Sequence, residues 1–348
     1  MSCKVMISGA AAQESTGTVT DIFMKPDILK GNHGEYIYFP QKEETILSAG
    51  KFSIVYLGAD ATNARRVIIK KLNPHLKDDQ KARLRFLVEA SVQVRHSAVI
   101  RSIDLVKANS TYYIIQEYIR GTDMKKLIAS GGFQKNEELI CRFIIPLLDA
   151  MDAVHSQGFI HRDIKPSNIL VRYKTDSENI DWKTPDIKLI DFGLAKTNDG
   201  IPLFPGAKKR APFSLLYSAP EVVLGMERLT DQRADLYSLA LVMMEMFTGQ
   251  PVVYADTPPQ IIARQLSRHP RRPSGMHPKF YNIFTKATAK EKFTTSPAKM
   301  PVDEIKHTLE SGKAQRYESA SEMKNAILDF LDDPGEMPKG LFQRIFKG

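Results

Sequence analysis

The residues best suited to chemistry lie in one short stretch, from His161 to Asn168, which reads HRDIKPSN. Within it, Asp163 can accept a proton from a hydroxyl group, Lys165 can neutralise a phosphate, and Asn168 can hold a metal ion. Further along the chain, Asp191 adds a second carboxylate, directly before a phenylalanine and a flexible glycine. Together these residue types supply the base, the cation and the metal ligands that phosphoryl transfer to an alcohol requires.

These groups occur in a specific order along the chain. H-R-D-x-K-x-x-N comes first, D-F-G follows from Asp191, and A-P-E ends at Glu221. This order resembles that of the protein kinase family. The resemblance extends over about residues 36–333, and residues 315–323 are similar to the closing motif of bacterial Ser/Thr kinases.

The resemblance implies a fold and a set of roles. The fold would be an α+β, bilobal kinase-like fold, with a small β-rich N-lobe and a larger, mostly helical C-lobe, which agrees with a pattern of strands followed by helices. Asp163 would orient and deprotonate the acceptor, and Lys165 would steady the transferred group. Asn168 and Asp191 would bind Mg²⁺, with Mn²⁺ as an alternative.

A lysine and a glutamate in the N-terminal half would hold the nucleotide's phosphates. Lys70 ends an apolar strand, and Glu89 is the only glutamate between Lys70 and Glu117. A helix is expected over residues 78–95, with apolar residues on one side: Leu84, Leu87, Val88 and Val92. Gln93 would then stand where the family buries an apolar side chain, and a buried amide needs a partner.

The resemblance also implies an ATP site. Two of the three glycines in the family's first hairpin are replaced here by Ser48 and Ser53. The adenine would lie between apolar walls, pair with the backbone of the connector between the lobes, and leave the ribose near an aspartate. The residues expected to bind ATP are Leu47, Gly50, Val55, Ile68, Lys70, Glu117, Ile119, Asp123 and Leu170.

Three functional readings follow. The first is an ATP-dependent Ser/Thr protein kinase, with autophosphorylation included; Lys165 and Ser214 favour serine or threonine acceptors in protein substrates. The second is a pseudokinase scaffold, for which Ser48, Ser53 and Gln93 speak. The third is a small-molecule kinase, against which Arg162, Lys165 and the A-P-E motif speak.

The segment after Asp191 bears on regulation. In many kinases a phosphorylated residue in this segment pairs with the arginine of H-R-D, here Arg162. Between Asp191 and Phe213, however, Thr197 is the only hydroxyl residue, and residues 208–210 are Lys-Lys-Arg. We therefore predict that the protein does not switch through a mid-loop phosphate. Either an acidic substrate or partner fills that role, or the segment is ordered without one.

Two further contacts are implied by the resemblance. Asp235 would anchor the backbone of the catalytic stretch, and Arg316 would form a buried ion pair with Glu221. Four arginines, Arg264, Arg268, Arg271 and Arg272, form a local basic patch, for which a solvated face is favoured over a docking site.

Composition limits the classes of function and the cellular locations that are expected. The chain has 348 residues, 43% of them hydrophobic, and a net charge of +9, which is modest for this length. Basic residues are not interleaved with aromatic ones, so we expect no nucleic-acid binding. The two cysteines are Cys3 and Cys141, the latter predicted to be buried and reduced. No apolar run could span a bilayer and the start fails as a secretory signal, so a cytoplasmic location is expected.

The expected organisation is a flexible arm over residues 1–35, an N-lobe over about 36–119, a C-lobe over about 120–333, and a tail over 334–348. Residues 173–185, which hold the only tryptophan, Trp182, are interpreted as a surface insertion. The lysine-rich stretch 290–315 is longer than usual and receives no assignment.

Overall fold

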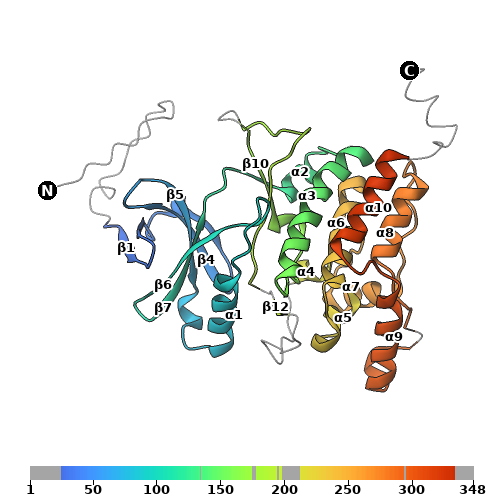
Figure 1. Ribbon diagram of the computed structural model, residues 1–348. Helices are drawn as coiled ribbons and strands as arrows, with labels where there is room; N and C mark the ends of the chain where they lie inside the picture. Colours follow the sequence, from blue (N-terminus) through green and yellow to red (C-terminus); the bar gives the residue numbers. More distant parts are fainter. Residues whose placement is uncertain are drawn as a thin grey trace.

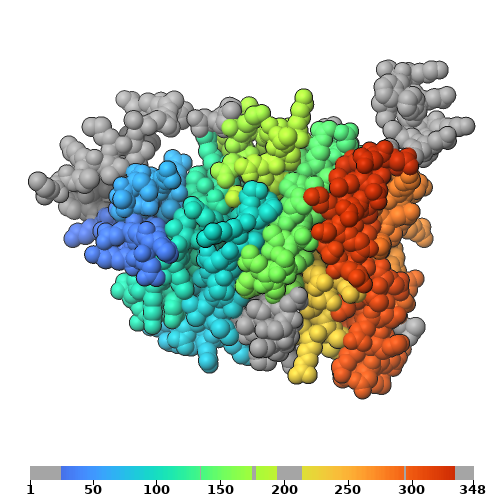
Figure 2. Space-filling model, in the orientation of Figure 1, coloured from blue at the N-terminus to red at the C-terminus, as the bar shows by residue number. Residues whose placement is uncertain are grey.

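The computed structural model describes residues 25–133, 135–174, 178–193, 196–197, 212–293 and 295–333. A β-sheet with one helix forms the N-terminal part, and a larger assembly of helices forms the C-terminal part (Figure 1). Figure 2 shows them at opposite ends of the molecule, the blue and cyan strands at one end and the orange and red helices at the other. This arrangement confirms the predicted bilobal α+β fold.

The N-lobe sheet is antiparallel and has the order β1-β2-β4-β5-β7-β6, with β3 paired to β4. The helix α1 (Gln80–Ser91) packs against β6 and β7. The strands are β1 (Asp27–Lys30), β2 (Glu35–Tyr38), β3 (Ile46–Ala49), β4 (Ser53–Asp60), β5 (Arg66–Leu72), β6 (Ser102–Ala108) and β7 (Thr111–Glu117).

The first strand corrects the predicted start of the N-lobe. Residues 27–30 lie in the arm expected over 1–35, yet they form β1 and pair with β2, with Asp27 opposite Tyr38. Leu29 is buried in the core that Tyr36 and Tyr38 share. The lobe therefore begins before residue 36, because this short strand covers the edge of the sheet. Residues 1–24 and the tail 334–348 lie outside the described residues.

Strand β5 shows how the sheet directs side chains to two faces. Successive side chains of a strand point to opposite faces. Val67 and Ile69 are buried in the N-lobe core, whereas Ile68 and Lys70 are only partly buried on the other face. This alternation turns Lys70 away from the core, and Val55 lies directly opposite it on β4.

The C-lobe is built around two long helices, α3 (Glu137–Ser156) and α6 (Arg233–Thr248). α3 buries a stripe that includes Phe143 and Cys141, and α6 is buried on nearly all sides. Its other helices are α2 (Met124–Ala129), α4 (Pro212–Leu215), α5 (Pro220–Val223), α7 (Pro258–Ser267), α8 (Pro278–Ala287), α9 (Val302–Ala314) and α10 (Ala320–Asp332).

The C-lobe also contains two small sheets. β8 (Gly121–Asp123), β10 (Ile169–Arg172) and β11 (Ile187–Leu189) form one, in the order β11-β10-β8. β9 (Phe159–Ile160) and β12 (Lys196–Thr197) form the other. Because β10 follows Asn168 and β11 precedes Asp191, this hairpin brings the two expected metal ligands to one end of the sheet.

The described residues of 173–185 and 290–315, the two stretches without a predicted role, pack against the C-lobe core or form a helix. Trp182 anchors the 173–185 insertion, since its ring lies 5.9 Å from that of Phe133 and 5.6 Å from that of Phe143. The 290–315 stretch contains α9, which buries Ile305 and Leu309. Among the described residues, no helix is long and apolar enough to cross a membrane.

Candidate active site

Lys70 joins the two lobes at the candidate site. Its Nζ lies 2.6 and 2.7 Å from the carboxylate oxygens of Glu89 and 2.9 Å from Oδ1 of Asp191. Glu89 comes from α1, Lys70 from β5, and Asp191 from the segment after β11. Three residues that are distant in sequence thus share one cluster of charge, as the resemblance implied. Gly193 fits tightly beside it, since a Cβ there would lie 3.2 Å from both Asp191 Oδ1 and Glu89 Oε2.

The pKa values of this cluster reflect burial opposed by opposite charge. Burial raises the pKa of Glu89 to about 6, although the Lys70 ammonium acts to lower it. The Lys70 ammonium lowers the pKa of Asp191 to about 2, with smaller effects from Lys165 and His161. Burial acts to lower the pKa of Lys70, but the carboxylates of Asp191 and Glu89 outweigh it and raise that pKa. Lys70 and Asp191 are therefore charged at neutral pH.

The catalytic stretch gathers around the Asp163 carboxylate, which is buried. Lys165 Nζ donates to Asp163 Oδ2 at 2.6 Å, and Asn168 Nδ2 donates to the same oxygen at 3.1 Å and to the Asp163 carbonyl at 2.8 Å. Lys165 Nζ also donates to Ser214 Oγ at 3.3 Å. No described residue donates to Asp163 Oδ1. That oxygen can therefore receive a proton from an acceptor.

Asp235 holds the backbone of this stretch, as expected. It is fully buried at the start of α6 and accepts from His161 N at 2.8 Å and Arg162 N at 2.7 Å. Its Oδ2 is also 2.9 Å from His155 Nε2. Arg162 has a φ of 66°, a left-handed conformation that costs free energy in a non-glycine residue. The two hydrogen bonds that the Asp235 carboxylate accepts from this backbone stabilise that conformation.

The residues expected to contact adenine lie partly open to solvent. Leu47 is 50% exposed, and Val55, Ile68 and Leu170 are partly buried. Ile119 is buried, and no described residue bonds to its backbone N–H or C=O, so both groups can pair with a base.

Glu117 and Asp123 have side-chain roles of their own. Glu117 Oε1 accepts from Lys188 Nζ at 2.9 Å and from Arg101 N at 2.9 Å. Asp123 lies opposite Leu170 in the β8–β10 pairing and caps α2 by accepting from Lys126 N. The contact of Asp123 with a ribose stays a prediction.

The first hairpin is held in place despite its missing glycines. Gly50 N donates to Ser53 O at 2.9 Å, and Asn73 Nδ2 donates to Gly50 O at 3.2 Å. Phe52 lies against Arg85 of α1, with the guanidinium carbon 5.1 Å from the ring centroid. The hairpin is thus held by contacts that do not require glycine at positions 48 and 53.

The helix expected over residues 78–95 is shorter than predicted, and the apolar residues expected on one side of it differ in burial: Val92 is buried, Leu87 and Val88 are partly buried, and Leu84 is exposed. α1 ends at Ser91, and its buried residues are Ala82, Phe86, Glu89 and Ala90, whereas Leu84 is 40% exposed. Gln93 lies beyond the helix end, is exposed, and bonds to Ala90 O. The amide is therefore not buried, because the chain leaves the helix before reaching that position. This argument for a loosened site, and for a pseudokinase, falls away.

Sequence reasoning missed one residue of the site. Arg162 Nη2 donates to Glu227 Oε1 at 2.7 Å, and the two side chains are 7% and 16% exposed. Glu227 follows A-P-E, and nothing in its local pattern signals a partner 65 residues away. Residues 198–211, which contain the predicted Lys-Lys-Arg, lie outside the described residues.

The geometry agrees with comparisons to known proteins. A family model described as "Protein kinase domain" matches residues 41–328. The chain belongs to the protein kinase family. Membership implies that ATP is used, and the charged residues gathered above are those that the family's motifs contribute.

Several relatives are Ser/Thr protein kinases. The chain is 29% identical over 68% of its length to the serine/threonine-protein kinase unc-51 of Caenorhabditis elegans. It is 27% identical over 80% to a probable serine/threonine-protein kinase PknB of Corynebacterium glutamicum, and 29% identical over 70% to PknB of Mycolicibacterium smegmatis. It spans 27%, 40% and 39% of these relatives, respectively.

The expected metal ligands fit Mg²⁺ in chemistry and position. Asp191 offers a charged carboxylate whose side chain is 42% exposed. Asn168 uses its amide nitrogen to bond Asp163, which leaves its carbonyl oxygen for a ligand. Ile190 N donates to the backbone carbonyl of Asn168 at 3.0 Å, so the backbone before Asp191 pairs with that of Asn168. Mg²⁺ prefers few protein oxygens together with substrate phosphates, and this pair meets that preference.

Proposed function

We propose that the protein is a Ser/Thr protein kinase that transfers the ATP γ-phosphoryl group to serine or threonine hydroxyls. The observation that carries this proposal is the ion-paired cluster of Lys70, Glu89 and Asp191 beside the open Oδ1 of Asp163. A cation that can bind phosphates, a metal ligand and a base thus occur together at the lobe junction. Charge stabilisation and positioning supply most of the acceleration in such a reaction.

The proposed step assigns each group one task. The acceptor hydroxyl donates its proton to Asp163 Oδ1 as its oxygen forms the bond to the γ-phosphorus, and the bond from that phosphorus to the β–γ bridging oxygen breaks to release ADP. Lys165 lies between Asp163 and Ser214, where its ammonium can neutralise the phosphoryl group in transfer. Lys70 binds the phosphates that remain on ADP. Bound Mg²⁺, held by Asn168 and Asp191, would neutralise phosphate charge.

The choice of acceptor rests on Lys165 and Ser214. Their contact closes the acceptor side of Asp163 at 3.3 Å, and the resemblance associates this pair of positions with serine and threonine. Protein substrates and ATP are the proposed partners, and autophosphorylation is included.

Glu227 supports a constitutive arrangement of the site. Its carboxylate occupies the Arg162 guanidinium that in many kinases pairs with a loop phosphate. A carboxylate supplies one negative charge where a phosphate would supply nearly two. Glu227 therefore supports the prediction that the protein does not switch through a mid-loop phosphate.

The test is incubation of the full chain with Mg²⁺-ATP and a generic protein acceptor, followed by phosphoamino-acid analysis. We expect phosphoserine and phosphothreonine from wild type and at least about 100-fold less from Lys70→Met, since transition-state charge stabilisation is lost. Lys71→Met is the matched control, because Lys71 lies on the same strand but over the Tyr113 ring. ATP binding without transfer by wild type would instead favour a scaffold.

A further inference from the structure

A basic pocket lies at the C-terminal end of α7, apart from the residues proposed to transfer phosphate. It encloses about 520 Å³, and its lining includes five basic side chains and no carboxylate. Val252 and Val253 form an apolar part of the wall. The basic residues are Arg264, Arg268, His269, Arg271 and Lys292.

Acidic side chains do not neutralise this pocket. Within the described part of the chain, none of its three arginines nor Lys292 forms an ion pair, whereas Arg162, Arg316 and Lys188 each pair with a glutamate. Like charges held together around a concave surface repel one another and raise the local concentration of anions. The absence of a protein counter-ion therefore points to an anionic ligand from outside the pocket.

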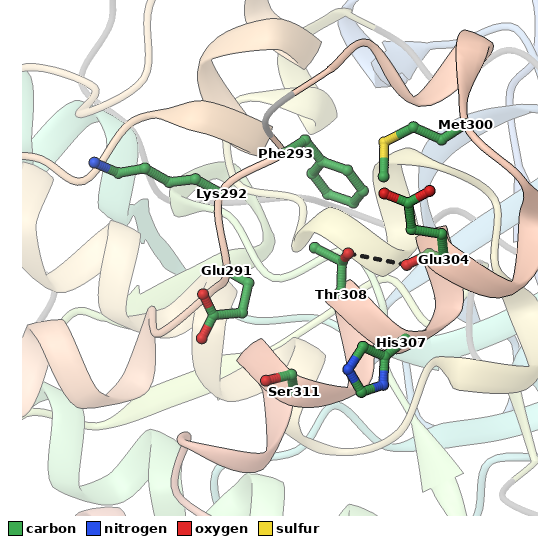
Figure 3. Close-up of a pocket in the computed structure, with 8 residues that line it drawn as sticks. All are labelled: Glu291, Lys292, Phe293, Met300, Glu304, His307, Thr308 and Ser311. Atoms are coloured by element: carbon green, nitrogen blue, oxygen red, sulfur yellow. Dashed lines mark hydrogen bonds between the residues drawn. The ribbon is translucent and has the colours of Figure 1, made fainter.

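Glu291 has a small electrostatic effect on His269 of the basic pocket, but it lines a neighbouring pocket and bonds elsewhere. Glu291 precedes Lys292 but accepts from Gln315 Nε2 at 2.7 Å. It lines a pocket against α9 with His307 and Ser311, and Figure 3 shows Lys292 extending away from those residues. Lys292 lines both pockets, but its side chain extends away from that of Glu291.

A buried glutamine connects the basic pocket to the acceptor side of the candidate active site. Gln265 follows Arg264 on α7 and is fully buried. Its Nε2 donates to the carbonyls of Leu215 and Leu216 at 3.0 and 2.7 Å, and Tyr237 OH donates to its Oε1 at 2.9 Å. Leu215 adjoins Ser214, which contacts Lys165. A segment held in the pocket would therefore lie on the same rigid unit as the site where an acceptor must bind.

We infer that this basic pocket binds a phosphoserine or phosphothreonine segment of a protein partner. Several guanidinium groups in a concave site suit phosphate, because each can donate two parallel hydrogen bonds to phosphate oxygens. Arginine clusters are a recurring means of recognising phosphorylated motifs. The source of such segments rests on the proposed function, which would make them. The inference deepens that function by naming substrates that already carry a phosphate.

The direct test measures binding of the full chain by fluorescence anisotropy. The probes are peptide libraries in which degenerate positions flank one fixed phosphoserine, serine or glutamate. We expect the phosphoserine library to bind at least about tenfold more tightly than either other library, because charge-assisted bonds to phosphate are lost in both. Equal binding of the glutamate library would overturn phosphate recognition, as would equal binding of single-stranded RNA of matched charge.

Two double variants test whether phosphopeptides bind in the basic pocket. Arg268→Gln with Arg271→Gln removes two exposed charges from the pocket, and we expect it to abolish the preference for phosphoserine. Arg272→Gln with Lys299→Gln removes two exposed charges outside the pocket and should preserve that preference. An unchanged preference in the first variant would overturn the assignment.

This test separates failure of the pocket from failure of the proposed function. Binding requires no phosphoryl transfer, so a chain that binds phosphopeptides but transfers nothing would sustain the pocket and contradict the kinase activity. A chain that phosphorylates the generic acceptor but shows no preference among the libraries would support the kinase activity and contradict the pocket. If both hold, the first variant should raise KM for a phosphorylated substrate and leave KM for the generic acceptor unchanged.

Discussion

Two arginine–glutamate pairs in the C-lobe have different designs. Arg316 and Glu221 are each 1% exposed, and two nitrogens of the arginine bond the two carboxylate oxygens at 2.7 and 3.1 Å. Arg162 and Glu227 are more exposed, at 7% and 16%, and Arg162 Nη2 donates to Glu227 Oε1 at 2.7 Å.

The difference in burial and bonding indicates that the Arg316–Glu221 pair stabilises the fold, whereas the Arg162–Glu227 pair positions the catalytic stretch. Arg316 also donates to Ala289 O and lies over the Tyr237 ring, so its whole guanidinium is committed to packing between the A-P-E segment, α6 and α10. Arg162 belongs to the catalytic stretch, so its partner controls a residue adjacent to Asp163. We therefore expect loss of the first pair to affect unfolding and loss of the second to affect catalysis.

The largest expected effect is that of Glu221→Gln. It leaves a buried guanidinium without its counter-charge and should lower the free energy of unfolding by about 3–5 kcal/mol. Urea denaturation measures this change. The control is Glu322→Gln, whose partner Lys286 is 45% exposed, and which should cost less than about 1 kcal/mol. Equal effects of both variants would contradict a structural role for the buried pair.

Glu227→Gln should lower kcat rather than stability. Freeing Arg162 allows the catalytic stretch to shift, and small misplacements of reacting groups slow a reaction, here by roughly tenfold. Steady-state kinetics at saturating ATP measures kcat, and urea denaturation should show a smaller loss of stability than that of Glu221→Gln, since this pair is less buried. A variant with wild-type kcat would show that Arg162 does not need this carboxylate.

Lys290 provides a pH-dependent probe of the buried pair. Burial, with a smaller effect of Arg316, lowers the pKa of Lys290 from 10.5 to about 7. Between those values the unfolded chain binds a proton that the folded chain does not, so stability should increase as pH rises through that range, by at most about 1.4 kcal/mol per pH unit. Urea midpoints at several pH values should lose this slope in Lys290→Met. Lys292→Met, at an exposed lysine two residues away, should retain it.

The smallest expected effect is that of Gln93→Ala. Gln93 is exposed beyond the end of α1, so its removal should change kcat less than about twofold and stability less than about 0.5 kcal/mol. Parallel kinetics and denaturation measure both. A large change in activity would show that Gln93 affects the site despite its exposure.

The site was predictable where residue spacing carried the information. Lys70, Glu89 and Asp191 could be matched to ordered motifs, and the structure brings them within hydrogen-bond distance. The Arg316–Glu221 pair and the anchoring by Asp235 followed from the same ordered motifs.

The features that could not be predicted from the sequence depend on contacts between distant segments of the chain. Apolar periodicity missed part of the buried face of α1, because that face contains Glu89, whose charge is compensated by a lysine on another element. β1 escaped detection because it has only four residues, with two apolar residues between charged ones, and pairs with β2 in the folded chain. Glu227 was missed because an ion pair across many residues leaves no local pattern.

The most direct test of the central claim compares wild type with Asp163→Asn in kcat for phosphoryl transfer and in affinity for ATP. Asn keeps the size of the side chain but cannot accept the proton, so kcat should fall by about 100- to 1,000-fold while the Kd for ATP changes less than about threefold. Asp149→Asn, which removes a carboxylate paired with Lys324, should leave both unchanged. A wild-type rate in Asp163→Asn would contradict the assignment of Asp163 as the base.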